Sequence, residues 1–82
     1  MSTWKEENQV LIKIFTFASF EEAMQFMQNA APFINEMDHH PTWSNTYNRV
    51  EVKLTTHDAG NKITEKDYNL SRILDEVYST TA

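Results

Sequence analysis

The stretch VLIKIFTF, residues 10–17, limits the kind of fold that the chain can adopt. It is rich in β-branched and aromatic residues, which is typical of a β-strand. Successive side chains of a strand point to opposite faces, and here both faces are apolar. One face carries Val10, Ile12 and Ile14, and the other carries Leu11, Phe15 and Phe17. Such a strand needs cover on both sides, so we expect helices of this chain on one side and a second subunit on the other.

The segments on either side of this strand predict a hairpin and a helix. A short strand at residues 4–7 can pair with it through a turn near Asn8. After it, Ser19 and Glu22 have the spacing of a capping box, which satisfies free N–H groups at a helix start. The apolar face of this helix is expected to comprise Phe20, Ala23, Met24, Met27, Ala30, Ala31 and Ile34. Pro32 interrupts the pattern because it lacks an N–H group, so we expect a kink or an early, frayed end there.

Residues 47–56 alternate strictly between polar and apolar side chains and predict a half-buried strand. Its apolar face carries Val50, Val52 and Leu54. HDAGNK at 57–62 then turns the chain, and residues 64–78 predict a helix with Thr64 as N-cap. The buried stripe of that helix is expected to comprise Leu70, Ile73, Leu74, Val77 and Tyr78. The order strand, strand, helix, strand, strand, helix predicts a two-layer α+β fold, a four-stranded antiparallel sheet with two helices on one face (ββαββα).

Length and composition restrict the domain organisation and the classes of function. With 82 residues and 40% hydrophobic content, we expect one domain over residues 1–82. The chain has no cysteine for disulfides or thiolate zinc sites, so oligomerisation is the expected further source of stability for a small core. A formal charge of −5 without any Lys/Arg cluster disfavours direct binding of nucleic acid. No apolar run is long enough to span a membrane and the N-terminus lacks a secretion signal, so a soluble, cytoplasmic protein is expected.

The chain has three histidines, and all lie where one expected element ends and another begins. His39 and His40 follow the first helix, and at such a corner both rings can face one cavity. His57 lies where the alternating strand gives way to the glycine turn. Three interpretations stay open: surface histidines near a helix end, a metal site, or imidazoles that exchange protons with a substrate. Acyl transfer is disfavoured because the chain has neither cysteine nor a serine in an elbow motif.

Other residues near these histidines also allow two interpretations each. Asp67 stands three residues after Thr64, so it is either the second half of a capping box or part of the site. Trp43 and Tyr47 are either core or interface aromatics, or a flat wall on which a heterocycle stacks.

Taken together, these residues resemble the pterin-4a-carbinolamine dehydratases. The resemblance extends from about Trp4 to the last helix, and it is carried by His39-His40-Pro41, Trp43, Tyr47-Asn48, VEVKL at 50–54, Thr56-His57, and Thr64 with Asp67. It implies a small α+β domain that forms homodimers or homotetramers, with neither metal nor cofactor because the pterin is the substrate. In longer relatives an additional helix precedes the tryptophan, and we expect that helix to be absent here.

The resemblance also implies an activity and a set of site residues. Family members eliminate water from 4a-hydroxytetrahydropterin to give quinonoid dihydropterin, which recycles tetrahydrobiopterin. The implied acid–base residues are His39, His40 and His57, and the implied substrate-binding residues are Asn35, Pro41, Trp43, Thr56 and Asp58. Asp67 is implied to lie behind the pocket and to orient His57. The alternative is a non-catalytic module that binds a pterin or serves as a protein-interaction dimerisation domain, and the side chain of the pterin stays open.

Overall fold

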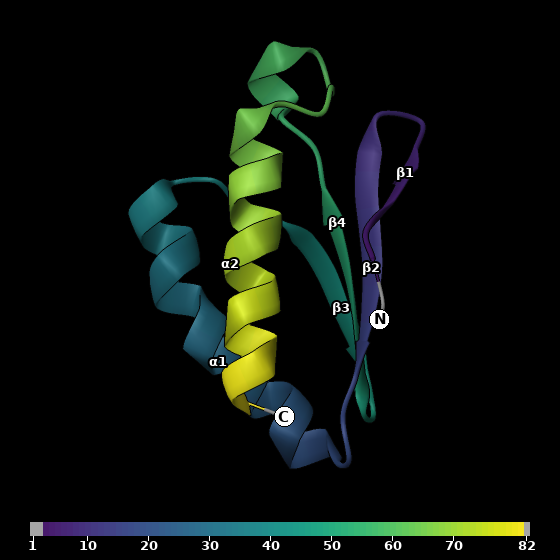
Figure 1. Cartoon of the computed structure of the whole chain (residues 1–82), viewed down its shortest axis with the longest axis vertical. Coiled ribbons are helices and arrows are strands. Elements are labelled where there is room, and N and C mark those ends of the chain that lie inside the picture. The colour runs from purple at the N-terminus through teal and green to yellow at the C-terminus, as the bar shows by residue number, and fades with distance from the viewer. Residues whose placement is uncertain (1–2, 82) are drawn as a thin grey trace.

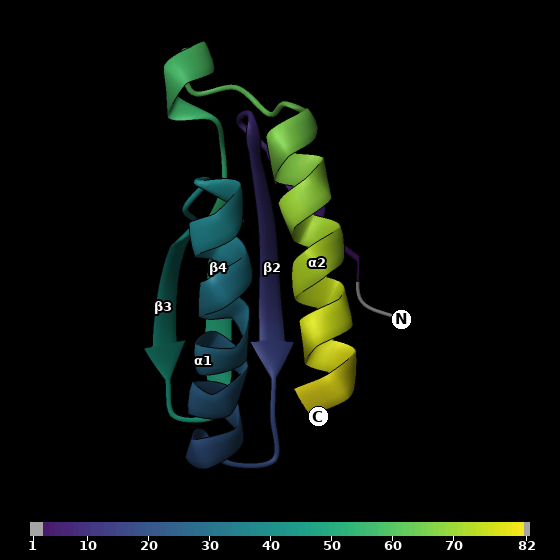
Figure 2. The same ribbon diagram turned by 90° about the vertical axis from the view of Figure 1, so that its left-hand side faces the viewer.

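The computed structural model describes residues 3–81, which form an antiparallel sheet covered on one face by two helices. The elements are β1 (Lys5–Glu7), β2 (Val10–Thr16), α1 (Phe20–Met37), β3 (Thr42–Thr46), β4 (Arg49–Leu54), the 3₁₀ turn η1 (His57–Ala59) and α2 (Glu65–Thr81). The strands lie in the order β1-β2-β4-β3, and every neighbouring pair is antiparallel. Figures 1 and 2 show α1 and α2 side by side on the same face of the sheet. The predicted ββαββα fold is therefore confirmed. The predicted order included a third strand without giving its residues, and the structure places this strand, β3, at Thr42–Thr46.

The short N-terminal strand and its turn are present where the sequence placed them. Asn8 and Gln9 form the turn with φ angles of 53° and 61°, and positive φ at both central residues is typical of tight hairpins. Lys5 pairs with Ile12 and Glu7 with Val10 across the hairpin. This geometry makes β1 one edge of the sheet.

The two faces of β2 differ in their cover. Leu11 and Phe15 are buried against the helices, as is Phe17 just beyond the strand end. On the opposite face Ile14 is 52% exposed, and no other element of residues 3–81 covers it. The predicted helical cover of one face is confirmed, whereas the chain itself leaves the second face open.

Helix α1 begins and ends with recognisable caps. Ser19 has extended backbone angles, and its hydroxyl accepts a hydrogen bond from the N–H of Glu22 at 3.2 Å, which confirms the predicted cap. The prediction of an early end at Pro32 is wrong, because the helix continues to Met37. Pro32 and Gln28 both lie on the exposed side, where water can bond the Gln28 carbonyl that Pro32 leaves without a donor.

The buried face of α1 also differs from the prediction. It comprises Ala23, Phe26, Ala30 and Ile34. Phe26 was left out of the predicted face although it is fully buried, whereas Phe20 and Ala31 were included and are exposed. The apolar side of α1 is wide and includes Met24, Met27 and Phe33 beside the buried stripe, so periodicity alone did not define which part of it faces the sheet.

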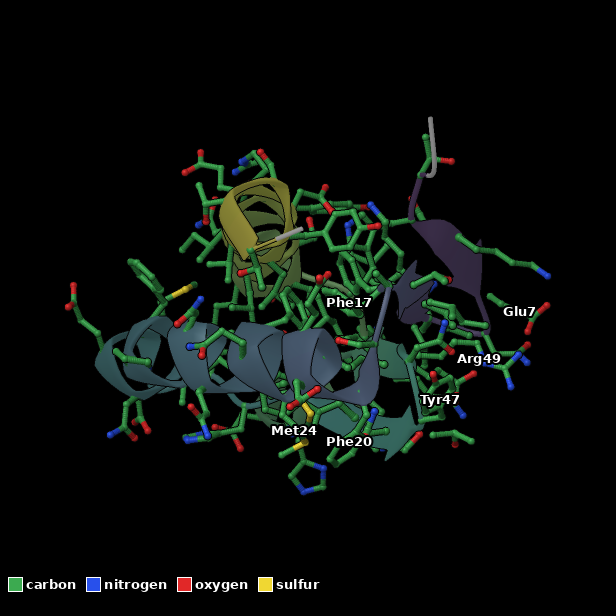
Figure 3. All side chains as sticks on the ribbon, turned by 90° about the horizontal axis from the view of Figure 1, so that it is seen from below. Glu7, Phe17, Phe20, Met24, Tyr47 and Arg49 are labelled. Atoms are coloured by element: carbon green, nitrogen blue, oxygen red, sulfur yellow. The ribbon has the colours of Figure 1, made fainter. Side chains whose placement is uncertain are left out.

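The core lies between the sheet and the helices. Val50, Val52 and Leu54 of β4 are fully buried, as the alternating pattern predicts. Four aromatic rings pack together, with Phe15 and Phe26 at 4.8 Å and Phe17 and Tyr78 at 5.2 Å between centroids. Figure 3 shows Phe17 inside, between helices and sheet, at one end of the molecule. From α2, the predicted stripe contributes buried Leu70, Leu74 and Val77, and half-buried Ile73 and Tyr78.

Polar contacts attach the N-terminal hairpin to α2. The Asp75 carboxylate accepts hydrogen bonds from the Lys13 ammonium at 2.7 Å and from the Trp4 indole at 3.2 Å. Nearer the start of the helix, the Tyr68 hydroxyl donates to the Glu6 carboxylate at 3.2 Å. Partial burial and the nearby negative charge of Glu6 raise the pKa of the Tyr68 phenol above its ordinary value. No helix between residues 3 and 81 has the length and hydrophobicity to cross a membrane.

One end of the molecule brings several element ends together. The C-terminal end of α1, the C-terminal end of β4, η1 and the N-terminal end of α2 all lie at the upper end in Figures 1 and 2. The β3–β4 turn and the start of α1 lie at the opposite end. Residues far apart in the sequence can therefore share one site at the upper end.

Candidate functional site

The backbone around the histidine pair turns sharply at Asp38. This residue caps α1 in the left-handed conformation, with φ 51° and ψ 40°, and its N–H bonds the carbonyl of Asn35 at 3.1 Å. The reversal sends His39 inward, where it is only 9% exposed, and leaves His40 exposed. Two adjacent histidines therefore have different environments.

His57 is placed by a second turn on the other side of the site. It opens η1 directly after buried Thr56, and the N–H of Gly60 bonds its carbonyl at 3.0 Å. Gly60 has φ 80°, a conformation that favours glycine. The His57 ring is exposed, and its Nδ1 lies 3.1 Å from the Asn61 side-chain oxygen.

The fully buried carboxylate of Asp67 holds the inward histidine in place. Its Oδ1 lies 2.6 Å from Nε2 of His39, while its Oδ2 accepts hydrogen bonds from the Thr56 hydroxyl at 2.7 Å and the Thr64 N–H at 2.9 Å. The Thr64 contact is one half of the predicted capping box. The expectation that Asp67 orients His57 is wrong, since the carboxylate pairs with His39 and His57 meets Asn61 instead. The Asp67 side chain therefore has two roles: it caps the start of α2 and it positions His39.

All three histidines line one hollow. This histidine hollow has a volume of about 230 Å³ and is lined by Asp38, His39, His40, Thr55, Thr56, His57, Asp58 and Lys66. Two aspartates, two threonines and a lysine therefore line the same small space as three histidines, the residue type that exchanges protons near neutral pH. Such an arrangement suits a reaction that needs one proton donor and one proton acceptor.

A second hollow adjoins the first at His40. This apolar hollow has a volume of about 600 Å³ and is lined by Gln28, Ala31, Pro32, Ile34, Asn35, His40, Pro41 and Trp43. His40 is the one residue among the two linings that borders both hollows. A ligand in either hollow therefore lies beside His40.

The predicted site residues divide between these two hollows. His39, His40, His57, Thr56 and Asp58 line the histidine hollow, whereas Asn35, Pro41 and Trp43 line the apolar hollow together with His40. Tyr47 belongs to neither, because it is 66% exposed at the β3–β4 turn at the far end of the molecule (Figure 3). Its interpretation as a stacking wall is therefore wrong.

Three residues that line the histidine hollow are absent from the predicted site. They are Asp38, Thr55 and Lys66. Each immediately precedes a residue of the predicted site, respectively His39, Thr56 and Asp67, and this adjacency is the signal that the sequence offers. Within residues 3–81, no three histidine, aspartate or glutamate side chains are grouped closely enough to hold a metal ion.

Comparisons with known proteins agree on one family. A family model described as pterin 4 alpha carbinolamine dehydratase matches residues 1–77. A protein of Opitutus terrae named "Putative pterin-4-alpha-carbinolamine dehydratase" is 47% identical over 74 residues, which cover 90% of this chain and 76% of that protein. A Bordetella avium protein of the same name is 50% identical over 68 residues, and the match covers 83% of this chain but only 62% of the relative's length.

Two solved structures share the fold. The crystal structure of a transcriptional coactivator/pterin dehydratase from Brucella melitensis superposes with a TM-score of 0.86 at 36% identity, over 92% of this chain and 81% of the other. A pterin dehydratase-like protein described as a RuBisCO assembly factor in the alpha-carboxysome gives a TM-score of 0.75 at 18% identity, covering 93% of this chain and 87% of that one. The second likeness concerns the fold alone.

Proposed function

This chain belongs to the pterin 4 alpha carbinolamine dehydratase family, and on that basis we propose that it catalyses the dehydration of a 4a-hydroxytetrahydropterin. The product is the quinonoid dihydropterin, so the enzyme is a hydro-lyase of tetrahydrobiopterin recycling. The observation that carries this proposal is the hollow of about 230 Å³ that His39, His40 and His57 all line. The pterin is the substrate, and the reaction uses neither a metal nor a cofactor.

Elimination of water requires two proton transfers. An imidazolium gives a proton to the hydroxyl on C4a, and the C4a–O bond breaks with release of water. A neutral imidazole takes the proton from ring nitrogen N5 as the C4a=N5 double bond forms. One proton passes from the ring to one histidine while another histidine loses one, so charge and atoms balance. Three imidazoles around one ring supply both groups.

The contact with Asp67 makes His39 the best candidate for the base. An ionised carboxylate only accepts hydrogen bonds, so Nε2 of His39 must carry the hydrogen in the 2.6 Å contact. The neutral ring then keeps its lone pair on Nδ1, the nitrogen that Asp67 does not occupy. Burial of the pair holds the ring in one orientation, as a carboxylate does in other histidine-dependent sites. His40 and His57, which are exposed, are left as the proton donors.

The pterin ring is proposed to occupy the histidine hollow, with Thr56 and Asp58 among its contacts. Asn35, Pro41 and Trp43 would then contact parts of the substrate that extend past His40 into the apolar hollow. Trp43 offers a flat face for stacking and Asn35 an amide for hydrogen bonding. We assign the protein to the cytoplasm and expect a homodimer or homotetramer.

A direct kinetic assay tests the activity. A 4a-hydroxytetrahydropterin is generated by a hydroxylase reaction, and its decay to quinonoid dihydropterin is followed by absorbance with and without the protein. We expect acceleration that is proportional to protein concentration. A sample that is folded by circular dichroism and leaves the uncatalysed decay unchanged would refute the proposal.

A second candidate function is a non-catalytic interaction module. It is favoured by the Brucella melitensis relative, which is described as a transcriptional coactivator as well as a pterin dehydratase. This alternative predicts that the protein binds a partner without turnover and that replacing the histidines leaves this binding unchanged. The kinetic assay therefore separates the two functions.

A further inference from the structure

Thr64 directs its hydroxyl away from the helix that it precedes. A threonine at the start of a helix normally accepts a hydrogen bond from a free N–H of the first turn. Here the hydroxyl oxygen of Thr64 lies 2.6 Å from the hydroxyl oxygen of Thr56, and no backbone N–H between residues 3 and 81 donates to it. The Thr64 hydroxyl therefore serves a contact with the loop after β4 rather than the start of α2.

The hydrogen bonds around Asp67 have a defined direction. An ionised carboxylate only accepts, so the Thr56 hydroxyl gives its single hydrogen to Oδ2 of Asp67 at 2.7 Å. Thr56 then has no hydrogen left for Thr64, and Thr64 must be the donor between the two hydroxyls. On the other side of the carboxylate, Nε2 of His39 lies 2.6 Å from Oδ1. One continuous chain of hydrogen bonds therefore leads from Thr64 through Asp67 to His39.

This chain is buried where it meets the carboxylate. Asp67 is fully buried and Thr56 is 5% exposed, so water has little access to replace a lost donor on either side chain. A hydroxyl that accepts a hydrogen bond also becomes a stronger donor. The hydroxyl of Thr64 therefore strengthens the bond from Thr56 to Asp67 and holds the Thr56 hydrogen on the carboxylate.

We propose that Thr64 is a positioning residue for His39, acting through the Thr56 hydroxyl and the Asp67 carboxylate. This inference rests on the proposed dehydratase function. Thr64 does not line the histidine hollow, so it acts on the His39 ring rather than on the substrate. The same chain commits the Thr56 hydroxyl hydrogen to Asp67, so Thr56 contacts the pterin without donating that hydrogen to it.

The form of the His39 ring depends on how firmly the carboxylate is held. With the Asp67 carboxylate on Nε2, the neutral ring keeps its hydrogen there and its lone pair on Nδ1. Loss of a donor to Asp67 weakens this hold, and the ring then populates the other tautomer, with the hydrogen on Nδ1. That tautomer cannot take the N5 proton on Nδ1. The chain from Thr64 therefore favours the form of His39 that acts as the base.

The kinetic test compares two substitutions at residue 64. Thr64→Val replaces the hydroxyl by a methyl group of similar size, whereas Thr64→Ser keeps the hydroxyl. In the dehydration assay, we expect Thr64→Val to lower kcat about five-fold, the rate equivalent of one hydrogen bond. KM should change less than about two-fold, because residue 64 does not line the hollow. Thr64→Ser should keep the wild-type kcat.

A matched control accounts for effects on the stability of α2. The buried hydroxyl of Ser71, in the same helix, donates to the Tyr68 carbonyl at 2.7 Å and does not line the hollow. Ser71→Ala should therefore lower the melting temperature without changing kcat. If Thr64→Val fails to fold, Thr64→Gly removes the same hydroxyl, and glycine is well tolerated at a helix start.

A spectroscopic readout separates positioning from support of the fold. In protein without ligand that carries ¹⁵N-labelled histidine, at a pH where the imidazoles are neutral, His39 should show a hydrogen on Nε2 and none on Nδ1. Thr64→Val should move the two nitrogen signals towards each other as the tautomers mix. Thr64→Ser and Ser71→Ala should leave both signals in place.

Two outcomes would overturn the inference and leave the proposed function standing. One is Thr64→Val with the wild-type kcat and unchanged His39 signals. The other is an equal loss of kcat and of melting temperature in Thr64→Val and Ser71→Ala, which would show that Thr64 acts by supporting the fold. Wild-type protein without dehydratase activity would remove the proposed function and the role of Thr64 in it, and the His39 signals alone would then decide whether Thr64 holds the ring.

Discussion

Asp67 is the residue on which the geometry of the site depends most. Its buried carboxylate joins His39, which follows α1, to Thr56 beyond the end of β4 and to Thr64 before α2. Thr56 and Thr64 are also joined directly, with 2.6 Å between their hydroxyl oxygens. Three segments that are distant in the sequence are thus held by one side chain, so the position of His39 and the start of α2 are coupled.

Replacement of Asp67 should affect stability and activity together. Asp67→Ala leaves His39, Thr56 and the Thr64 N–H without their buried acceptor, so we expect a loss of about 3 kcal/mol in the free energy of unfolding. Urea denaturation measures that loss, and the dehydration rate should fall as His39 loses its fixed orientation. The control is Glu65→Gln in the same helical turn, which is exposed. Equal stability of the two variants would contradict the role given to Asp67.

The histidines themselves should be separable from the fold. His39→Ala and His57→Ala are each expected to lower the dehydration rate by about 10² or more, because each removes a proton-transfer group. Tyr47→Ala at the far end of the molecule should leave the rate unchanged. Histidine variants that fold and retain the wild-type rate would refute the acid–base assignment.

At this scale the sequence located the site but not its internal contacts. The spacing and turns around His39, His40 and His57 indicated residues that do border one hollow. The sequence indicated His57 as the partner of Asp67, whereas the structure pairs Asp67 with His39. Which histidine reaches the carboxylate depends on the path of the loops after α1 and β4, and residue spacing does not determine that path. Asp38 was missed because the sequence did not show that α1 ends at this residue, in a left-handed conformation that turns the chain.

At the scale of elements, the sequence did not indicate that the N-terminal hairpin is attached to α2 through Asp75. Lys13 lies on the inward face of β2, with its side chain only 7% exposed, and reaches the Asp75 carboxylate at 2.7 Å. Its ammonium also lies 4.9 Å from the centroid of the Phe15 ring. An inward lysine breaks the alternation expected of a strand, and its partner lies 62 residues away. A pattern within the strand could not reveal that partner.

Loss of the Asp75 carboxylate should loosen this attachment. Asp75→Ala removes the acceptor of both Lys13 and Trp4, so we expect about 2 kcal/mol lower stability and a change in tryptophan fluorescence. The exposed pair of Lys5 and Glu7 at 3.3 Å serves as a control. Lys5→Ala should cost less than about 0.5 kcal/mol, since exposed ion pairs contribute little. Comparable losses for the two variants in urea denaturation would count against a special role for Asp75.

At the scale of the whole molecule, the sheet has one face without cover from this chain. Ile14 lies on it at 52% exposure, opposite Glu51 of β4. The order of elements and the alternation in β4 were enough to predict the two layers and the antiparallel sheet. They were not enough to define the stripe of α1 that faces the core, because Phe20, Phe26 and Phe33 widen the apolar side of that helix beyond the buried stripe. Cover for the outer face of the sheet must come from another molecule, so the sequence of one chain does not identify it.

An oligomer that buries this face is expected to dissociate when the face is charged. Sedimentation of the wild-type protein at micromolar concentration should give a mass of two or four chains. Ile14→Glu should shift the distribution towards the monomer, because burying an unpaired carboxylate is costly. A wild-type protein that sediments as a monomer would contradict the expected oligomer.

The central claim is that His39, His40 and His57 meet around one pterin ring. The chain has three histidines in total, so histidine selectively labelled with ¹⁵N gives three sets of imidazole signals, which His→Gln variants assign. The most direct measurement is the NMR spectrum of this sample with and without a saturating dihydropterin, a stable analogue of the product. The account predicts that the ring signals of all three histidines shift on binding. Signals of His57 that stay unchanged while those of His39 and His40 move would contradict it.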